Sequence, residues 1–404
     1  MPASTAASLL DGRASGSVDK ARGMTPDDLF AAIERSGLRG RGGAGYPLAK
    51  KIAAVRSAAL LSGREPLVIA NAYDADPGSP LARTLIERNL ASLMQGVAIA
   101  AHAVGADEAL VYMHPEANGA RSAVEQDVTT RSVAFGSLTV TVAIGPGGFM
   151  GGEESALMNV LESRRATARQ RPPYPAGMGV QMRPTLISSA ETLAWLPQIV
   201  SDGARADTKL VSVTGAVTAP GVYEVPLGIT LAEILERAGG VRGQLKAIQV
   251  GGPTGGILAA SKGSVRLGFE ELKAAGTHMG SAQIRAIAND TCIVAEAAKM
   301  FAYLSKETCG ICIPCRVGTS RVQGILESVQ SQLGRDTDIA WLGDLGDHME
   351  KFSLCGFGIT APSILRTTML EFAEDYRAHI QERRCPNGTC KPIRARRYET
   401  MAQP

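Results

Sequence analysis

The cysteines of this chain gather near its C-terminal end, and three of them stand at a spacing that suits a metal cluster. Cys309, Cys312 and Cys315 form a C-x2-C-x2-C run, and Cys355 follows later in the chain. Three thiolates at this spacing can bind one 4Fe-4S cluster, whose fourth cysteine comes from elsewhere. We therefore predict a 4Fe-4S cluster on these four cysteines. Buried structural thiols and a redox C-x-x-C pair are the alternatives, and the third cysteine of the run counts against the latter.

The three remaining cysteines could form a second metal site. Cys292, Cys385 and Cys390 together with His379 make a closed set of three thiolates and one imidazole, which suits zinc, and the C-x4-C spacing is within the range of zinc ligands. Free thiols, or ligands of another group, are the alternative. No secretory signal is visible, so metal ligation in a reducing compartment is favoured over disulfides.

Two glycine-rich segments could bind a nucleotide. The segment 40–45 fits G-x-G-x-x-G but follows a helix, so it is a weak dinucleotide fingerprint. This segment leads into a helix that contains Lys51, and the N-terminus of that helix could bind a phosphate. The alternative is that the segment is a plain flexible loop. The segment 145–152 follows a strand and precedes a helix. Glu153 and Glu154 begin that helix, and they could bind ribose hydroxyls or only complement the helix dipole.

The elements that must position these residues alternate between strand and helix in the first half of the chain. This alternation predicts an α/β fold with a parallel sheet. The expected strands are 66–73, 109–113 and 138–144, and helices are expected at 81–90 and 91–104. Asp74 and Asp76 follow the first strand, where open α/β sheets bind ligands. The proline-rich segment 171–196 is expected to be a stiff loop, either a lid or a surface linker.

The later part of the chain changes pattern twice. Residues 209–252 predict a small strand–helix–strand module, and helices from residue 293 onward predict a four-helix arrangement with the cluster at its end. The net charge of +3 gives no indication of nucleic-acid binding. The most apolar window, 93–113, is interrupted by polar residues, so we predict no membrane span.

These motifs together resemble the NADH-binding flavoprotein subunit of respiratory complex I and the beta subunits of NAD-dependent iron hydrogenases and formate dehydrogenases. The resemblance covers about residues 25–384 and rests on the segments 37–45, 152–154, 172–176 and 191–193 and on the cysteine run, all in the family's order. The C-terminal Cys-Pro pair is closer to the hydrogenase and formate dehydrogenase members.

The resemblance implies a domain plan. It comprises a disordered leader (1–24), a Rossmann-like α/β FMN/NAD(H) domain (25–205), a soluble-ligand-binding β-grasp domain (206–260), a connector (261–288), a four-helix 4Fe-4S domain (289–384) and a cysteine-containing tail (385–404). We expect the β-grasp domain to be a spacer and interaction module without a ligand.

The resemblance also implies cofactor-binding residues. Those expected at FMN are Gly42, Gly43, Gly45, Lys51, Asn71, Asp74, Gly152, Glu153, Ser188 and Ser189. Those expected at NAD(H) or NADP(H) are Tyr46, Asp76, Phe149, Glu154 and Tyr174.

The expected flavin pocket departs from the family pattern. Tyr73 replaces an aspartate, Asp74 and Asp76 replace glutamates, and Ser188 and Ser189 replace two asparagines. Each lost hydrogen bond costs about 1 kcal/mol, so FMN is expected to bind more weakly than in the family.

We therefore expect the electron-input subunit of a multisubunit oxidoreductase, which passes electrons between NAD(P)H and the 4Fe-4S cluster through FMN. Its partner would be a thioredoxin-like 2Fe-2S subunit or another iron–sulfur or ferredoxin protein. We expect it in the cytoplasm, attached to a membrane only through partner subunits. The alternatives are a non-catalytic iron–sulfur scaffold with a decayed flavin site and ferredoxin-dependent reduction of NAD(P)+.

Overall fold

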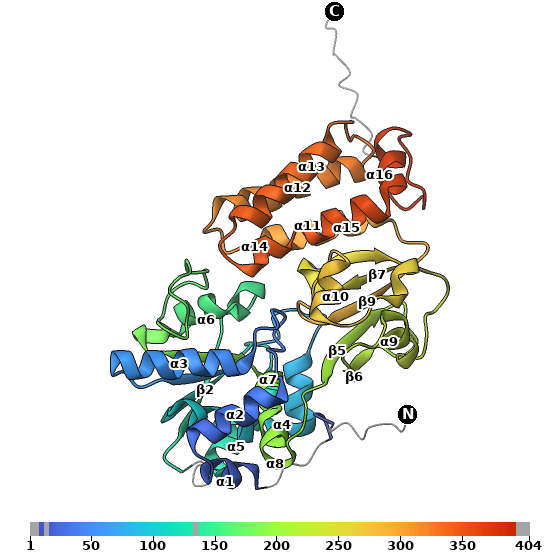
Figure 1. The fold of residues 1–404 in the computed structure, drawn as a ribbon. Coiled ribbons are helices and arrows are strands. Elements are labelled where there is room, and N and C mark those ends of the chain that lie inside the picture. Colours follow the sequence, from blue (N-terminus) through green and yellow to red (C-terminus); the bar gives the residue numbers. More distant parts are fainter. Residues whose placement is uncertain (1–7, 12–15, 132–135, 393–404) are drawn as a thin grey trace, which may run out of the picture.

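The first domain, in the lower part of Figure 1, is built on a parallel sheet. Its strand order is β3-β2-β1-β4. The computed structural model describes residues 8–11, 16–131 and 136–392. The strands are β1 (Leu67–Ala72), β2 (Glu108–Met113), β3 (Thr139–Ile144) and β4 (Thr185–Ser189). The first three match predicted strands. The prediction of a loop is wrong for β4, a short buried strand that pairs with β1 from Leu67↔Thr185 onward. Residues 185–189 form a strand because they pair with β1, which lies far away in the sequence.

Helices cover this sheet, and local signals set several of their ends. They are α2 (Pro26–Ser36), α3 (Leu48–Ser62), α4 (Leu81–Val104), α5 (Asn118–Arg131), α6 (Glu154–Leu161), α7 (Ala190–Ala194) and α8 (Leu196–Asp202). Thr25 caps α2 by accepting a hydrogen bond from Asp28 N at 3.1 Å, and Gly37 ends it with φ +67°. The two helices expected at 81–104 form one helix with a kink at Asn89.

The segment 1–24, expected to be disordered, is partly folded. Residues 1–7 and 12–15 lie outside the described residues, but 17–22 form α1 (Ser17–Arg22), which packs on α4 and α8. Leu9 and Leu10 are 1% and 4% exposed, and Leu9 N donates to Glu224 of the second domain at 2.8 Å. The prediction of disorder is wrong for these residues, because Leu9 and Leu10, which lie among small residues in the sequence, are buried in an apolar environment.

The second domain contains a five-stranded sheet with the order β6-β5-β9-β7-β8. Its elements are β5 (Thr208–Gly215), β6 (Gly221–Pro226), α9 (Leu231–Arg237), β7 (Leu245–Val250), β8 (Gly256–Ala259), α10 (Phe269–Ala274) and β9 (Gln283–Ala288). The strand β9 lies between β5 and β7. The segment 261–288 is therefore part of this domain, because its last strand is the central strand of the sheet, and it is not a separate connector.

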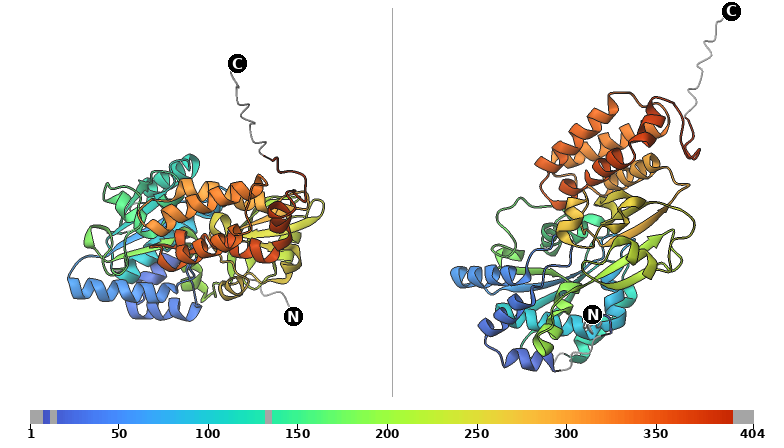
Figure 2. Two further views of the ribbon diagram at one scale, coloured as in Figure 1. Left: turned by 90° about the horizontal axis from the view of Figure 1, so that it is seen from above. Right: turned by 45° about the vertical axis from the view of Figure 1, so that its right-hand side comes forward.

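The third domain is helical and stands at one end of the molecule, at the top of the right-hand view in Figure 2. It contains α11 (Ile293–Glu307), α12 (Ile313–Gln330), α13 (Asp338–Phe352), α14 (Gly356–Thr360), α15 (Ser363–Glu371) and α16 (Ala373–Ile380). The helices α15 and α16 are separated by the single residue Phe372. In the part of the chain that the structure describes, no helix has the length and apolar character to cross a membrane.

Candidate cofactor cavity and metal centres

A cavity of about 530 Å³ lies where the three domains meet. The first domain contributes Gly42 and Gly43 of the first glycine segment and Asn71 at the end of β1. The β-grasp domain contributes His278, and the helical domain contributes Phe357. The β-grasp domain is thus more than a spacer, since it forms one wall of the cavity. The volume is typical of small-molecule sites.

The first glycine segment is pressed against the β-grasp domain. A Cβ atom at Gly43, whose φ is +104°, would lie 2.7 Å from the carbonyl oxygen of Gly280. A Cβ atom at Gly45 would lie 2.7 Å from the ring of Phe269. Glycine is required here by close packing as well as by backbone conformation. Gly42 and Gly43 line the cavity, whereas Gly45 faces Phe269 and does not line it.

Arg41 is a cavity residue that the sequence reasoning missed. It is 3% exposed, and its Nη2 donates to the carbonyl of Ala206 at 2.7 Å. Its Nε has no hydrogen-bond partner among the described residues. Burial lowers the pKa of this guanidinium, and the charge of Glu191 opposes that shift. The sequence signal that could have identified Arg41 is its position between two glycines at the start of the segment.

Three of the residues expected at FMN use their side-chain oxygens to cap helices. Asp74, with φ +43°, accepts 2.8 Å hydrogen bonds from the first-turn amides of α4, and burial raises its pKa to about 6. Glu153 accepts from the amides of Ser155 and Ala156 at 2.9 Å and so caps α6. Ser189 caps α7. All three line the cavity with these oxygens already bonded.

Asn71 and Asp76 connect elements around the cavity. Asn71 Nδ2 donates to the carbonyl of Gly152 at 2.9 Å, which joins the end of β1 to the second glycine segment. Asp76 is 4% exposed and accepts from Gly78 N at 2.9 Å and from Ser281 Oγ at 2.5 Å. Because Ser281 belongs to the β-grasp domain, Asp76 holds two domains together at the cavity wall.

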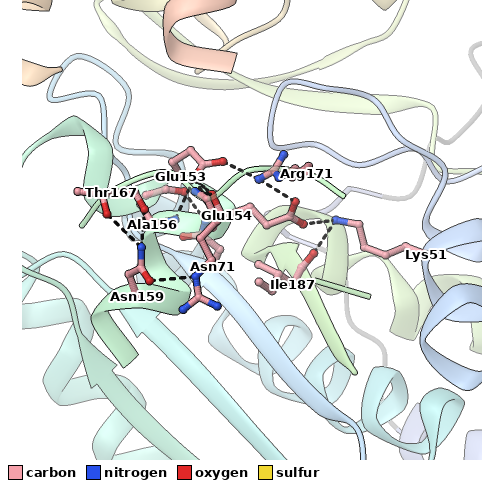
Figure 3. A network of polar contacts seen from close by, with 12 residues as sticks. Lys51, Asn71, Glu153, Glu154, Ala156, Asn159, Thr167, Arg171 and Ile187 are labelled. Atoms are coloured by element: carbon pink, nitrogen blue, oxygen red, sulfur yellow. Dashed lines mark hydrogen bonds and ion pairs between the residues drawn. The ribbon is translucent and has the colours of Figure 1, made fainter. Parts of the chain in front are cut away.

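A network of ion pairs lies beside the second glycine segment (Figure 3). Lys51 Nζ is 2.7 Å from Glu154 Oε1 and donates to the carbonyl of Ile187 at 2.8 Å. Arg171 is 2.6 Å from Glu153 and 3.5 Å from Glu154. Lys51, which was expected at a phosphate, is therefore paired with a carboxylate that was expected at the nucleotide.

The other expected residues divide between the cavity and its surroundings. Gly152 and Phe149 line the cavity. Ser188 is 8% exposed and does not line it. Tyr46 and Tyr174 also lie outside the lining and are 52% and 60% exposed, respectively, so both rings are accessible.

The side chain of Tyr73 packs against the second glycine segment. It is 1% exposed, and its ring stacks on that of Tyr112 with centroids 5.2 Å apart. A Cβ atom at Gly145 would lie 2.4 Å from the Tyr73 ring, and one at Gly151 would lie 2.1 Å from its hydroxyl oxygen. The ring of Tyr73, which stands where the family has a carboxylate, thus packs against the segment. Burial raises the pKa of the Tyr73 hydroxyl to about 12.

The four predicted cluster cysteines come together at one end of the helical domain. Cys309 and Cys312 lie between α11 and α12, Cys315 lies in the first turn of α12, and Cys355 directly precedes α14. Burial, together with the charges of the other three cysteines, raises the pKa of Cys315 to about 12. Four neighbouring thiolates repel one another, so the site requires a cationic group such as an iron–sulfur cluster to hold them ionised.

The second predicted metal site is also assembled. The ligand atoms of Cys292, His379, Cys385 and Cys390 all lie within 4.8 Å of one another. His379 Nδ1 is 2.7 Å from the carbonyl of Asp375, and its Nε2 is 3.5 Å from Cys292 Sγ. A backbone carbonyl bound to the far ring nitrogen is the usual support of a metal-binding histidine. The donor set and its compactness fit tetrahedral zinc.

Comparison with known proteins agrees with this arrangement. Residues 33–198 match the Nuo51 FMN-binding domain, residues 210–258 match the SLBB domain, and residues 295–379 match the NADH-ubiquinone oxidoreductase-F iron-sulfur binding region. The FMN-binding domain and the 4Fe-4S-binding region were both expected, and these predictions are confirmed.

Relatives match along almost the whole chain. The F subunit of the NADH-quinone oxidoreductase from Streptomyces coelicolor is 33% identical over 394 residues, which are 92% of this chain and 87% of that protein. The HndC subunit of the NADP-reducing hydrogenase from Solidesulfovibrio fructosivorans is 33% identical over 396 residues, which are 92% of this chain and 79% of that protein.

A solved structure supports the same assignment. A chain of the NAD+-reducing NiFe-hydrogenase in the air-oxidized state matches with a TM-score of 0.84 at 31% identity over 92% of this chain. This chain spans 66% of that hydrogenase chain. The chain therefore belongs to the family of the NADH-quinone oxidoreductase F subunits and the related subunits of NAD(P)-reducing hydrogenases.

Proposed function

We propose that this chain is the electron-input subunit of a multisubunit oxidoreductase and that it passes electrons between NAD(P)H and a 4Fe-4S cluster through FMN. The observation that carries the proposal is the shared cavity. Its lining includes Gly42 and Gly43 of the first glycine segment, and also Gly356 and Phe357, which directly follow the expected cluster ligand Cys355. A group bound in this cavity would lie beside the cluster-binding loop.

The residues present fit FMN. The buried Arg41 offers a cation with an unpaired Nε at the cavity wall, and a guanidinium suits a phosphate group. Gly42 and Gly43 leave the adjacent backbone without side chains. Bound FMN would supply the conversion between two-electron hydride transfer and one-electron transfer. The chain would supply position, exclusion of water and the exit to the cluster.

The expected FMN residues act in two ways in this proposal. Asn71 and Gly152 shape the wall at the end of β1. Asp74, Glu153 and Ser189 hold the N-termini of α4, α6 and α7 at the wall, so their contribution to the cofactor is indirect.

The nucleotide would enter along the ion-pair network of Figure 3. Phe149 lies in the cavity, where a nicotinamide could meet the flavin. The exposed rings of Tyr46 and Tyr174 could stack on the adenine, and Glu154 could accept a hydrogen bond from a ribose once released from Lys51. The HndC relative belongs to an NADP-reducing enzyme, so both nucleotides are candidates.

The partner that we propose is a thioredoxin-like 2Fe-2S subunit, or another iron–sulfur or ferredoxin protein, which meets the chain near the 4Fe-4S site. We propose a cytoplasmic location, with membrane attachment through other subunits. We further propose that Cys292, His379, Cys385 and Cys390 bind a structural zinc ion that fixes the C-terminal segment to α11 and α16.

Cofactor analysis of the anaerobically purified protein tests the proposal. We expect FMN together with about four iron atoms per chain, and loss of the iron in Cys309→Ser. Iron that persists in Cys309→Ser would refute the cluster assignment. Stopped-flow bleaching of the flavin absorbance by NADH and by NADPH then identifies the nucleotide, and bleaching by neither would refute the catalytic proposal.

A non-catalytic iron–sulfur scaffold is the second candidate, and Tyr73 is the observation that favours it. The side chain of Tyr73 fills space where the family has a carboxylate. This candidate predicts iron–sulfur absorbance with no FMN released by acid precipitation. Ferredoxin-dependent reduction of NAD(P)+ would instead retain FMN and reverse the direction of electron flow.

A further inference from the structure

We propose that Glu307 and Phe357 are positioning residues that clamp the second glycine segment to the cluster-binding loops, so that cluster binding and FMN binding strengthen each other. This inference rests on the proposed function. It concerns contacts between the segment 145–152 and the two parts of the chain that carry the cluster cysteines.

The first contact comes from the end of α11. Glu307 is the last residue of that helix and lies two residues before Cys309. Its Oε2 accepts a hydrogen bond from Phe149 N at 2.6 Å, and a Cβ atom at Gly148 would lie 3.0 Å from the same oxygen. Gly148 has φ +72°, so the backbone turns here in a way that brings the amide to the carboxylate. A hydrogen bond from an amide to a carboxylate is among the stronger ones.

The second contact comes from the other part of the ligand set. Phe357 lies two residues after Cys355, is 5% exposed and packs on the ring of Phe149 with centroids 5.6 Å apart. Both rings line the cavity. The backbone of Phe149 is therefore held by the loop of Cys309, and its side chain is held by the loop of Cys355.

The opposite side of the segment is fixed by the first domain. Asn71 bonds the carbonyl of Gly152, and Tyr73 packs under Gly151. The segment is therefore held between the first domain and the two cluster-binding loops. When the cluster holds its four cysteines together, it fixes Glu307 and Phe357, and these fix the cavity wall. By thermodynamic reciprocity, a ligand that orders the wall stabilises the cluster loops equally.

A double-mutant cycle on FMN affinity tests the coupling. FMN dissociation constants are measured by quenching of flavin fluorescence for wild type and Glu307→Ala, each with the cluster intact and after oxidative removal of the cluster with a chelator. We expect Glu307→Ala to weaken FMN binding about tenfold with the cluster present and less than twofold without it. Glu307→Gln, which keeps an acceptor oxygen, should restore most of the affinity. The matched control is Glu327→Gln on α12, which should have no effect.

A separate readout follows the cluster itself. Phe357→Leu should lower FMN affinity while keeping about four iron atoms per chain, which separates loss of the clamp from misfolding. Equal effects of Glu307→Ala with and without the cluster would overturn the inference, as would unchanged FMN affinity after cluster removal. Wild-type protein that binds no FMN in either state would instead overturn the proposed function on which the inference rests.

Discussion

The buried ion pair between Lys209 and Glu191 joins the first strand of the β-grasp domain to the wall of the cavity. Lys209 is 0% exposed; its Nζ lies 2.5 Å from Glu191 Oε2 and donates to the carbonyl of Leu210 at 2.8 Å. Glu191 Oε1 also accepts from Leu210 N at 2.8 Å. Burial lowers the pKa of Lys209, and the charge of Glu191 opposes that shift.

We predict that Glu191→Gln destabilises the protein by about 3–5 kcal/mol at pH 7, because it removes the negative charge and leaves the buried ammonium group with neutral partners only. The upper limit is the free energy needed to remove the proton from Lys209, because the neutral amine can be buried without a charged partner. Losing its proton at pH 7, against an ordinary pKa of 10.5, costs about 5 kcal/mol.

The penalty should depend on pH in a way that a packing defect would not. In the variant, the folded-state pKa of Lys209 lies below its unfolded value, so the folded state binds fewer protons above that pKa. Stability of the variant then rises with pH by about 1.4 kcal/mol per unit, up to the unfolded pKa. The gap to wild type should therefore shrink between pH 7 and pH 9.

Urea unfolding of wild type and Glu191→Gln at pH 7, 8 and 9 measures this difference. Glu34→Gln, at an exposed position on α2, is the matched control, and its effect should stay within about 0.5 kcal/mol. A penalty below about 1 kcal/mol, or one that does not change with pH, would refute the reasoning.

Three further predictions concern the metal site, a buried acid and the second glycine segment. His379→Ala should remove zinc measured by elemental analysis while iron is retained, and zinc that survives would contradict the assignment. Burial raises the folded-state pKa of Asp74 to about 6, so its contribution to stability is greatest below its ordinary pKa and falls as pH rises through 6. The unfolding free energy of wild type relative to Asp74→Asn should therefore fall from pH 4 to pH 7, and a constant difference would disprove this. Gly151→Ala should abolish FMN retention because its Cβ would lie 2.1 Å from the hydroxyl oxygen and 2.5 Å from Cζ of Tyr73, and Tyr73→Leu, which removes both atoms, should recover FMN when added to it; absence of recovery would exclude that clash as the cause.

Local patterns were sufficient for several elements of the fold. The end signals of α2 at Thr25 and Gly37 act within one helical turn, so the sequence alone predicts them. The loop prediction for β4 and the assignment of β9 to a connector were wrong for the opposite reason. Each is defined by a neighbour distant in the chain, β1 for β4 and both β5 and β7 for β9, and no local pattern identifies that neighbour.

The candidate metal sites show the same division. The sequence by itself determined which residues carry chemistry, since thiolates at C-x2-C-x2-C spacing are reactive toward metals in any fold. Only the tertiary structure brought Cys292 and His379 together with Cys385 and Cys390. The pairing needs α11 and α16 to pack side by side, which is a long-range property.

The polar residues of the cavity depended most on tertiary structure. The sequence supplied Asp74, Glu153 and Lys51 as candidates for cofactor binding, but it could not show that two of them cap helices and that the third pairs with Glu154. It also gave no indication that the β-grasp domain contributes His278 to the wall. The physical reason is that a polar side chain bonds the nearest available partner, and folding decides which partner that is.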